Sequence, residues 1–429
     1  MEKDANKSRL TALNIPVLTG AGTGLFHDPS RVSVLDRWMA RKLHDLLGYP
    51  PLDFVLWNGE TIRAADMPSR NRLHFRDSDV LQKLLMNPPL HFGDLYSAGR
   101  IEVEGDLVES LVATYRAVAA SPKYRKLNEA QMRLFHRPRP NHLAGSRDNI
   151  HHHYDIGNEF YGLWLDREAM QYTCAYFPSP GLTIEQAQRA KMDHVCRKLQ
   201  LKPGDHVVEA GSGWGGFARH MARYYGARVR SYNISHQQVL YARERARADG
   251  LGKNLEYVED DYRNITGECD VFVSIGMLEH VGRDNYRELG DVIHRCLAPD
   301  GRGLIHSIGR NKPELMNAWI EKRIFPGAYP PTLREMMDIF EPRGFSVLDV
   351  ENLRLHYART LEHWLKRFEQ HAEKIEKKYD GAFVRAWRLY LAGSIAGFTA
   401  GTLQLFQVLF ARGTNNDLPW SRAHLYREE

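Results

Sequence analysis

The chain has 429 residues, 43% of them hydrophobic, which is enough for one large domain and one smaller domain. Its net charge is only +5, and its four cysteines show no CxxC spacing, which excludes a zinc knuckle and a disulfide framework and fits a reducing compartment. The N-terminus is charged from Glu2 to Arg9 and lacks the apolar core of a signal peptide, so a cytoplasmic protein is expected.

Residues 1–115 predict a small α+β domain. Residues 54–57 read as a strand, and 79–86 read as a helix that Pro88-Pro89 ends. A second apolar-periodic helix is expected over 107–118.

A basic segment, 116–150, follows as a linker. Between Arg116 and Arg147 it has a single acid, Glu129. Its cations are Arg116, Lys123, Arg125, Lys126, Arg133, Arg137, Arg139 and Arg147. Such a segment suits anionic lipid headgroups or nucleic acid, and the alternative is a solvated linker.

From Pro203 onward, strands and helices alternate. The expected strands are 206–210, 227–233, 255–258, 270–275 and 303–308. This alternation predicts a parallel sheet with helices on both faces and a ligand at the carboxyl ends of its strands. Residues 312–345 and 357–412 are expected to be largely helical additions that cover the sheet edge.

The uncharged stretch 389–410 is long enough to be mistaken for a membrane span. It also carries polar residues and places Gly393, Gly397 and Gly401 at every fourth position. We therefore predict a buried helix whose glycine face packs closely against another helix or an acyl chain.

The segment 207–216 is the most informative, because a short apolar strand ends in an acid and glycines follow at tight spacing. Gly211, Gly213 and Gly216 satisfy GxGxxG, which alone is weak support for a dinucleotide. The next strand ends at 231–235 without the acid that a dinucleotide ribose requires. Asp261 and Tyr262 follow the third strand and suit an adenine, so the pattern favours S-adenosylmethionine.

With these motifs the chain resembles the cyclopropane-fatty-acid synthase family, which includes the mycolic acid cyclopropane synthases. The resemblance spans about 150–413 and rests on seven islands in one order: 153–158, 171–177, the glycine turn, 276–282, 305–309, 324–327 and 357–361. It implies an α/β, Rossmann-like S-adenosylmethionine-dependent methyltransferase fold with helical insertions over 151–413, followed by a tail, 414–429. Residues 92–96 and 102–107 are similar to the N-terminal lipid-associated domain of phospholipid-acting members.

The resemblance also implies a bound bicarbonate ion as the catalytic base. Five residues match the family's ligands for it: Cys174, Glu279, His306, Tyr357 and, through its backbone N–H, Ile308. The set is chemically sensible, because bicarbonate both donates and accepts hydrogen bonds. Taken singly, Cys174 is more often a small buried hydrophobe and His306 a structural histidine.

The resemblance assigns nine residues to the cofactor. Tyr172, Gly211, Gly213 and Trp214 match the methionine and ribose side, Asn233, Ile234 and Gln238 the turn after the second strand, and Asp261 and Tyr262 the adenine end. This chain departs from the family at Asn233 and at Ser212, and both changes keep small or polar character. For Trp214, packing at the helix start is a serious alternative. Adjacent side chains in 151–153 point in different directions, so this histidine triplet is not expected to bind a metal.

The function expected from the resemblance is formation of a cyclopropane ring on an unsaturated phospholipid acyl chain by a cytoplasmic enzyme bound peripherally to the inner membrane. The nearest alternative is a related fatty-acid methyltransferase with a methyl-branched or exomethylene product. A small-molecule methyltransferase would not need five anion-holding residues. No base-flipping motif is found, so nucleic acid is not an expected partner. The oligomeric state is left open, a homodimer included.

Overall fold

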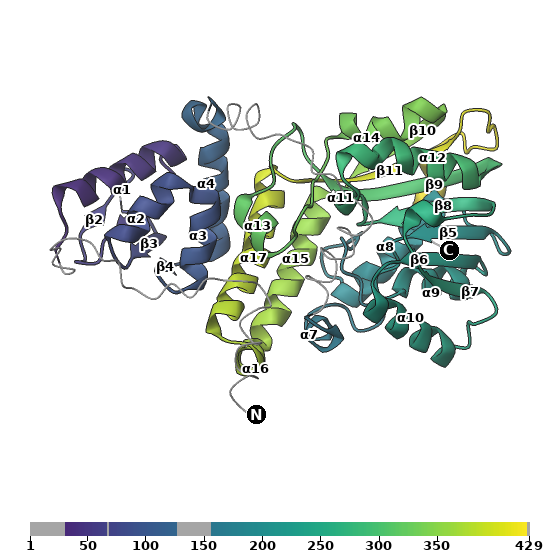
Figure 1. Cartoon of the computed structure of the whole chain (residues 1–429), viewed down its shortest axis with the longest axis horizontal. Coiled ribbons are helices and arrows are strands. Elements are labelled where there is room, and N and C mark those ends of the chain that lie inside the picture. Colours follow the sequence, from purple (N-terminus) through teal and green to yellow (C-terminus); the bar gives the residue numbers. More distant parts are fainter. Residues whose placement is uncertain (1–30, 67, 127–155, 427–429) are drawn as a thin grey trace. The chain divides into compact units, whose positions relative to one another are not determined.

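The computed structural model describes residues 31–66, 68–126 and 156–426. These residues form two compact units that interleave along the chain (Figure 1). The first unit takes its described residues from 1–137, 314–326 and 364–402, and the second takes them from 138–313, 327–363 and 403–429. Two segments that the sequence analysis grouped with the methyltransferase domain therefore belong with N-terminal residues.

The first unit contains a four-stranded sheet of order β2-β1-β3-β4, in which β1 and β3 are parallel and the outer pairs are antiparallel. Its strands are β1 (Asp53–Val55), β2 (Thr61–Ile62), β3 (Arg72–Phe75) and β4 (Ile101–Glu104). Helices α1 (Val34–Leu47) and α2 (Ser78–Met86) pack together. Ser33 and Asp36 form a capping box that begins α1, and Gly48 ends it in the left-handed conformation.

The predicted helix over 79–86 is confirmed as α2, and the two prolines follow it as predicted but also start another helix. Helix α2 has already ended at Met86, and Pro88 starts the next helix, α3 (Pro88–Ser97), where its missing N–H costs nothing. Helix α4 (Leu107–Ala120) begins after the capping side chain of Asp106, as predicted, and runs five residues past the expected domain boundary at 115.

Helices from the later segments complete the first unit. They are α13 (Ala318–Arg323), α16 (Ala372–Lys378) and α17 (Gly381–Ala400). Helix α13 contacts α3, and α17 contacts both α3 and α4. Gly93 permits the first contact, because a Cβ there would lie 2.3 Å from the Trp319 ring. Arg385 fixes the second by donating to the carbonyl of Tyr96 at 2.6 Å.

The predicted helix over 389–410 is wrong in its second half. Helix α17 ends at Ala400, where Gly401 adopts φ 82° and its N–H donates to the Gly397 carbonyl. The chain then forms β11 (Gln404–Arg412), because a short apolar run with two aromatic residues suits a strand buried on both faces. Gly393 makes only an ordinary contact with α4, since a Cβ there would lie 3.5 Å from the Tyr115 hydroxyl, so this approach does not require glycine. Within the described part of the chain, no helix is both long and apolar enough to span a membrane.

The second unit is built on a seven-stranded sheet of order β10-β11-β9-β8-β5-β6-β7. Five neighbouring strands are parallel, and β11 is antiparallel to both β9 and β10. The strands other than β11 are β5 (His206–Ala210), β6 (Arg228–Asn233), β7 (Leu255–Glu259), β8 (Cys269–Ile275), β9 (Leu297–Gly309) and β10 (Phe345–Asn352). The five predicted strands are confirmed, β9 is longer than predicted, and β10 and β11 were not predicted.

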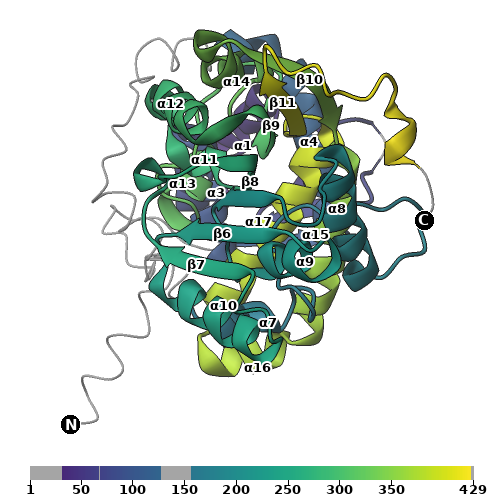
Figure 2. The ribbon, with the colours of Figure 1, turned by 90° about the vertical axis from the view of Figure 1, so that its right-hand side faces the viewer.

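Helices cover both faces of this sheet, as predicted. One face packs against α8 (Ile184–Lys198), α9 (Gly216–Tyr224) and α10 (His236–Ala248), and the other packs against α12 (Tyr286–Cys296) and α14 (Leu333–Phe340). Figure 2 shows α8 and α9 on one side of the strands and α12 and α14 on the other. The alternation along β5 explains this division, because Val207 and Val208 belong to opposite core clusters.

Shorter elements complete the second unit. They are α7 (Asn158–Gly162), α11 (Leu278–Val281), the first ten residues of α15 (Arg354–Gln370), and 3₁₀ turns at Tyr262–Asn264, Arg283–Asn285, Glu341–Arg343 and Arg422–Leu425. The segments that follow β5, β6, β7 and β8 all leave the same edge of the parallel sheet. The predicted site residues lie on these segments and on the ends of the neighbouring strands.

Candidate active site

The glycine turn after β5 is held tightly against β6. The N–H groups of Gly211 and Ser212 both donate to the Tyr232 carbonyl, at 2.9 and 3.1 Å. Gly211 adopts φ 93°, and a Cβ at Gly215 would lie 2.4 Å from the Tyr257 hydroxyl. The turn therefore needs glycine both for its backbone conformation and for close packing.

Asn233 joins the turn to the helix that follows β6. Its side-chain amide donates to the Gly213 carbonyl at 3.1 Å and to Gln238 Oε1 at 2.9 Å. Its own Oδ1 accepts from the Ser235 N–H at 3.0 Å. Gly213, Asn233 and Gln238 were predicted as cofactor residues, and the structure brings them together. Ile234 lies half-buried between them.

Trp214 and Tyr172 belong to an aromatic cluster beside the turn. The Tyr161 ring lies 4.9 Å from the Trp214 ring and 5.4 Å from the Tyr172 ring, between centroids. The Trp214 indole N–H donates to Asn158 Oδ1 at 2.7 Å, and the side chain is buried. The Trp214 ring thus packs at the start of α9, which is the alternative that the sequence left open. Its backbone is still part of the glycine turn.

Asp261 and Tyr262 follow β7, but both make structural contacts. Asp261 Oδ1 accepts from the Arg263 N–H at 2.9 Å, and Oδ2 pairs with the Arg263 guanidinium at 3.1 Å. Tyr262 contributes its ring to the core beneath α12, and burial raises the pKa of its hydroxyl. Asp260, next to them, donates its N–H to the Asn233 carbonyl at 3.1 Å, which links this segment to the turn after β6.

Glu279 and His306 form the buried polar part of the predicted anion site. Glu279 lies on α11 after β8, and its Oε1 accepts from the Ile308 N–H at 2.5 Å. His306 lies two residues before Ile308 on β9, so the two side chains share one face of that strand. Among the described residues, neither Glu279 Oε2 nor His306 Nε2 has a hydrogen-bond partner, although both atoms are buried.

Burial shifts the protonation of this pair in opposite directions. It raises the pKa of Glu279 to about 7, against hydrogen bonds from its own N–H, the Ile308 N–H and Ser307. Burial lowers the pKa of His306 well below its ordinary value, and two nearby lysines, Lys191 and Lys198, lower it further. His306 is therefore neutral at physiological pH.

Cys174 and Tyr357 are joined through the carbonyl of Leu353. The Cys174 thiol lies 3.9 Å from this oxygen, and the Tyr357 N–H donates to it at 3.1 Å. Leu353 in turn donates its N–H to the Leu405 carbonyl at 2.9 Å, and Leu405 lies opposite Ile308 in the sheet. Strand β11 thereby connects Cys174 and Tyr357 to the Glu279 and His306 pair. Burial raises the pKa of Cys174, which keeps its thiol protonated.

The loop after β8 connects this polar cluster to the glycine turn. The Gly276 N–H donates to the His306 carbonyl at 2.8 Å. The same loop also packs against the glycine turn, because a Cβ at Gly211 would lie 3.1 Å from the Met277 Cβ. A Cβ at Gly276 would lie 2.9 Å from Thr173. The predicted cofactor turn and the predicted anion site therefore adjoin.

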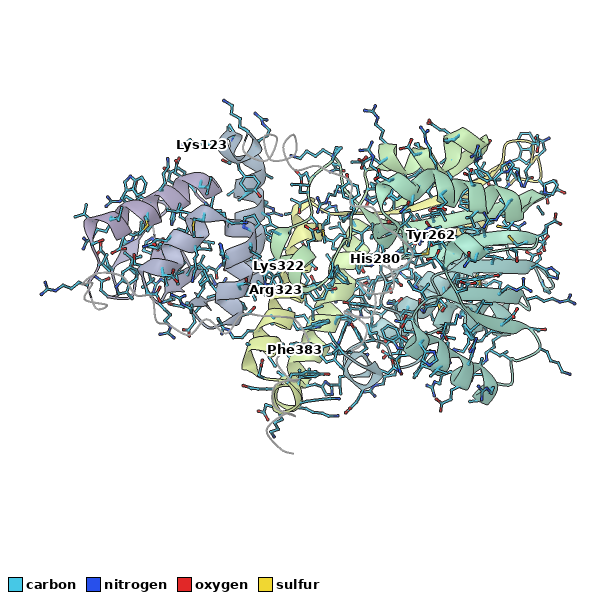
Figure 3. The ribbon with its side chains drawn as sticks, in the orientation of Figure 1. Lys123, Tyr262, His280, Lys322, Arg323 and Phe383 are labelled. Atoms are coloured by element: carbon cyan, nitrogen blue, oxygen red, sulfur yellow. The ribbon has the colours of Figure 1, made fainter. Side chains whose placement is uncertain are left out.

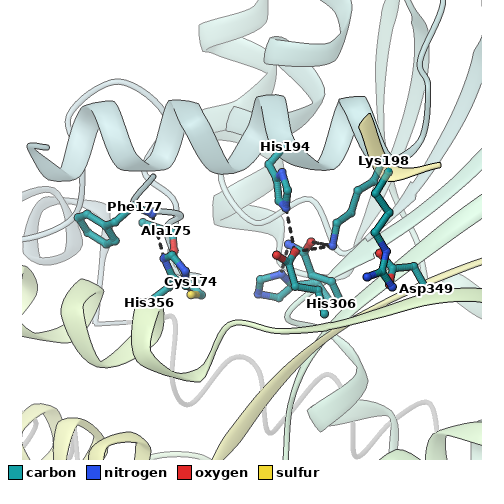
Figure 4. Close-up of polar contacts among 11 residues, drawn as sticks. Cys174, Ala175, Phe177, His194, Lys198, His306, Asp349 and His356 are labelled. Atoms are coloured by element: carbon teal, nitrogen blue, oxygen red, sulfur yellow. Dashed lines mark hydrogen bonds and ion pairs between the residues drawn. The ribbon is translucent and has the colours of Figure 1, made fainter. Parts of the chain in front are cut away.

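Four polar residues near the site were not predicted from the sequence: Lys191, Lys198, Glu351 and Gln407. Lys191 is fully buried, donates to Gln171 Oε1 at 2.5 Å, and has its pKa lowered to about 8 by burial. Lys198 donates to Glu351 at 2.6 Å and to Gln407 at 2.8 Å (Figure 4). A sequence signal existed, because Lys191 and Lys198 occupy the apolar face of α8 together with Val195.

Some predicted features lie outside the described residues. These are the histidine triplet 151–153 and most of the basic segment. From that segment the structure describes Arg116, Lys123, Arg125 and Lys126.

The sheet order, the single antiparallel strand and the glycine turn define the Rossmann-like fold of S-adenosylmethionine-dependent methyltransferases. The sequence profile of the mycolic acid cyclopropane synthetase family matches residues 142–408, and the chain belongs to this family. It is accordingly an S-adenosylmethionine-dependent methyltransferase.

Individual relatives agree with this assignment. A probable fatty acid methyltransferase of Pseudomonas putida is 34% identical over 88% of this chain and 96% of the relative. The cyclopropane-fatty-acyl-phospholipid synthase of Escherichia coli K12 is 39% identical over 63% of this chain and 69% of the relative. Among solved structures, mycolic acid cyclopropane synthase CmaA1 in complex with SAH and CTAB is 26% identical with a TM-score of 0.58, covering 62% of this chain and 97% of that one.

Proposed function

We propose that this enzyme adds one carbon from S-adenosylmethionine to the double bond of an unsaturated phospholipid acyl chain and closes a cyclopropane ring, with bicarbonate as the base. The observation that carries the proposal is the pair of buried atoms, Glu279 Oε2 and His306 Nε2, that lack hydrogen-bond partners within the described residues. Leaving such atoms without a partner costs free energy, so their arrangement beside the glycine turn supports a small polar ligand.

Bicarbonate fits this donor and acceptor set. A neutral imidazole can donate to one of its oxygens, and the Glu279 carboxylate can accept from its hydroxyl group. Cys174 and Tyr357 would complete the site, and the Ile308 N–H, which donates to Glu279 Oε1, would hold that carboxylate in place beside the anion. When bound, bicarbonate would supply the base that takes a proton from the newly added methyl group.

When bound, S-adenosylmethionine would supply an electrophilic methyl group. The alkene would attack this group and release S-adenosylhomocysteine, which leaves a positive charge on the neighbouring carbon of the acyl chain. Gly213, Asn233 and Gln238 would position the cofactor, because they form one hydrogen-bonded unit at the edge of the sheet. Glu279 would face the developing positive charge and stabilise it in a site from which water is excluded. Cys174 would bind as a thiol rather than act as a nucleophile, because its raised pKa keeps it protonated.

Lipid mass spectrometry tests this function. Cells that produce the protein should gain unsaturated-chain phospholipids heavier by one CH₂ group, and fragmentation should identify a ring. With purified protein, bicarbonate-depleted buffer should slow ring formation, and added bicarbonate should restore it in a saturable way. Ring formation that ignores bicarbonate would contradict the proposed base.

A second candidate is a fatty-acid methyltransferase with a methyl-branched or exomethylene product. The Pseudomonas putida relative favours it, because its match covers 96% of that protein, whereas the match to the Escherichia coli synthase covers 69%. The same fragmentation separates the candidates, since a branch or an exomethylene group would appear in place of the ring.

We further propose that the first unit docks the cytoplasmic enzyme on an anionic membrane surface. Helix α1 exposes Val34, Leu35 and Trp38, whose exposed fractions are 81%, 59% and 55%, with the cations Arg41 and Lys42 one turn further along. An exposed apolar strip beside cations is typical of helices that lie in a lipid headgroup layer. Lys123 lies just after α4 (Figure 3), and its ammonium group pairs with Asp45.

Vesicle sedimentation tests the docking surface. The protein should bind vesicles rich in phosphatidylglycerol at low salt and bind them less as salt screens the charges. Trp38→Ser should weaken binding several-fold, whereas Trp420→Ser removes an even more exposed ring from the second unit and should not. Equal binding by both variants, or indifference to anionic vesicles, would overturn this part of the proposal.

A further inference from the structure

The environment of His306 determines which of its ring nitrogens carries the hydrogen. Gln407 lies directly opposite His306 in the antiparallel pair of β11 and β9. The side-chain amide nitrogen of Gln407 lies 3.1 Å from His306 Nδ1, and its Oε1 lies 2.8 Å from Lys198 Nζ. Figure 4 shows this sequence of contacts from Lys198 to His306.

Lys198 fixes the orientation of the Gln407 amide. A lysine ammonium has three hydrogen-bond donors and no acceptor, so the group that faces it must be the amide oxygen. The reversed amide would set two donors against each other and lose a charge-assisted hydrogen bond. The amide nitrogen therefore faces His306, and because it only donates, Nδ1 must accept.

The charge on Lys198 is itself held in place. Glu351 Oε2 accepts from Lys198 at 2.6 Å and lies 2.8 Å from His194 Nε2. These hydrogen bonds lower the pKa of Glu351 to about 2 against the effect of burial, so the carboxylate is ionised at neutral pH. The His194 ring stacks on the ring of Tyr176, with the two centroids 4.3 Å apart. Tyr176 lies two residues after Cys174 in the chain.

We propose that Lys198 and Gln407 are positioning residues that hold neutral His306 in the tautomer with hydrogen on Nε2. The inference rests on the proposed function, in which His306 binds the catalytic anion. An Nε2–H directed at that site donates to an anion, whereas the other tautomer would present a lone pair and repel it. This arrangement extends the site to residues on α8 and β11 that touch neither the cofactor nor the substrate.

Nitrogen NMR of ¹⁵N-histidine-labelled protein tests the tautomer directly. The His306 signals are assigned by their absence in His306→Gln. The wild type should carry hydrogen on Nε2 and none on Nδ1, and hydrogen on Nδ1 would overturn the inference. In Gln407→Glu, a carboxylate oxygen takes the place of the amide nitrogen. Because this oxygen accepts hydrogen bonds, His306 Nδ1 should gain a hydrogen. A spectrum unchanged by this substitution would overturn the role of Gln407.

The bicarbonate dependence of turnover separates this inference from the proposed function. Gln407→Leu removes the donor to Nδ1 and should raise the half-saturating bicarbonate concentration about tenfold, with a smaller change in the maximal rate. S-adenosylhomocysteine binding should persist, which shows that the fold is intact. The control is Glu256→Gln, which breaks the exposed pair between β7 and Arg230 on β6 and should leave the dependence unchanged. NMR could give the expected hydrogens while Gln407→Leu leaves the half-saturating bicarbonate concentration unchanged. In that case Lys198 and Gln407 do fix the tautomer of His306, but the proposed role of His306 in binding bicarbonate is wrong.

Discussion

Two buried acid–base pairs, one in each unit, differ in how their hydrogen bonds are completed. In the first unit, the side chains of Asp94 and Arg323 (Figure 3) are each only 7% exposed, and two hydrogen bonds of 2.9 and 3.0 Å join them. In the second unit, Glu279 and His306 are equally buried, yet each keeps one polar atom without a partner among the described residues. Buried polar groups normally have their hydrogen bonds completed, so folding alone explains the first pair, and the second supports the proposed ligand.

The contrast also separates two sequence motifs that the family resemblance highlighted. In the 92–96 motif, Gly93 admits the Trp319 ring and Asp94 binds Arg323, so this motif fastens α13 to α3. In the motif 276–282, Gly276 binds the His306 carbonyl and Glu279 binds the Ile308 N–H, which builds a site. Removing a residue from the first motif should cost stability, and removing one from the second should cost activity.

The largest expected effect is the loss of product formation in the Glu279→Gln variant. The amide keeps the shape of the side chain but loses the negative charge and the oxygen atom that is proposed to accept from a bicarbonate hydroxyl. Product formation should fall about 10²- to 10⁴-fold, the usual contribution of a group that assists proton transfer. Mass spectrometry of the lipid product measures it, with S-adenosylhomocysteine affinity expected to stay within about threefold. Turnover near that of the wild type would place the catalytic site elsewhere.

The next largest effect is on the stability of Asp94→Ala. It leaves Arg323 buried without its carboxylate partner, and breaking a buried pair in this way costs about 3–5 kcal/mol. Urea denaturation measures the loss of unfolding free energy. The matched control is Glu102→Gln, which breaks the exposed pair with Arg76 and should cost less than about 1 kcal/mol. Equal effects of the two substitutions would contradict a structural role for the buried pair.

Overpacking at Gly93 should be milder. A methyl group there would collide with the Trp319 ring, and such overpacking costs about 1–3 kcal/mol. In Gly181→Ala, by contrast, the new methyl group meets nothing within 4 Å, and the same urea assay should find almost no change. If Gly93→Ala were as stable as the control, the close contact between α3 and α13 would not exist in solution.

The last expected effect is on how the stability changes with pH. Burial raises the pKa of Glu279 from 4.5 to about 7. Between these pH values the folded protein keeps a proton on Glu279 that the unfolded chain has lost, so the unfolding free energy falls as pH rises through this window. Glu279 contributes a slope of at most about 1.4 kcal/mol per pH unit, which Glu279→Gln should remove. Glu209, whose pKa burial also raises to about 7, keeps its own share in both proteins. Parallel stability curves for the variant and the wild type would show that Glu279 is not buried.

Sequence patterns predicted the parts of the fold in which local preference and packing agree. The apolar runs that became β5 to β8 are flanked by turn residues and have ordinary strand lengths, so their type was clear. The segment 389–410 misled, because an uncharged run fits a helix and a buried strand equally well until Gly401 divides it. The start of α3 was missed because a proline pair both ends and begins helices.

The anion site was predicted only through residues that the family resemblance supplied, whereas the glycine turn and the residues after the third strand were also indicated by the pattern itself. Lys198, Glu351 and Gln407 come from three distant segments, and only the packing of α8, β10 and β11 brings them to His306. No local spacing relates them. The roles of Trp214 and Asp261 also required the structure, which gives both residues structural partners within the fold.

The central claim is that Glu279 and His306 hold a bicarbonate ion. A crystal structure of the protein with S-adenosylhomocysteine and bicarbonate tests it most directly. The account predicts a planar anion that accepts a hydrogen bond from His306 Nε2 and donates one to Glu279 Oε2. A water molecule between these two atoms, with no anion at saturating bicarbonate, would contradict it.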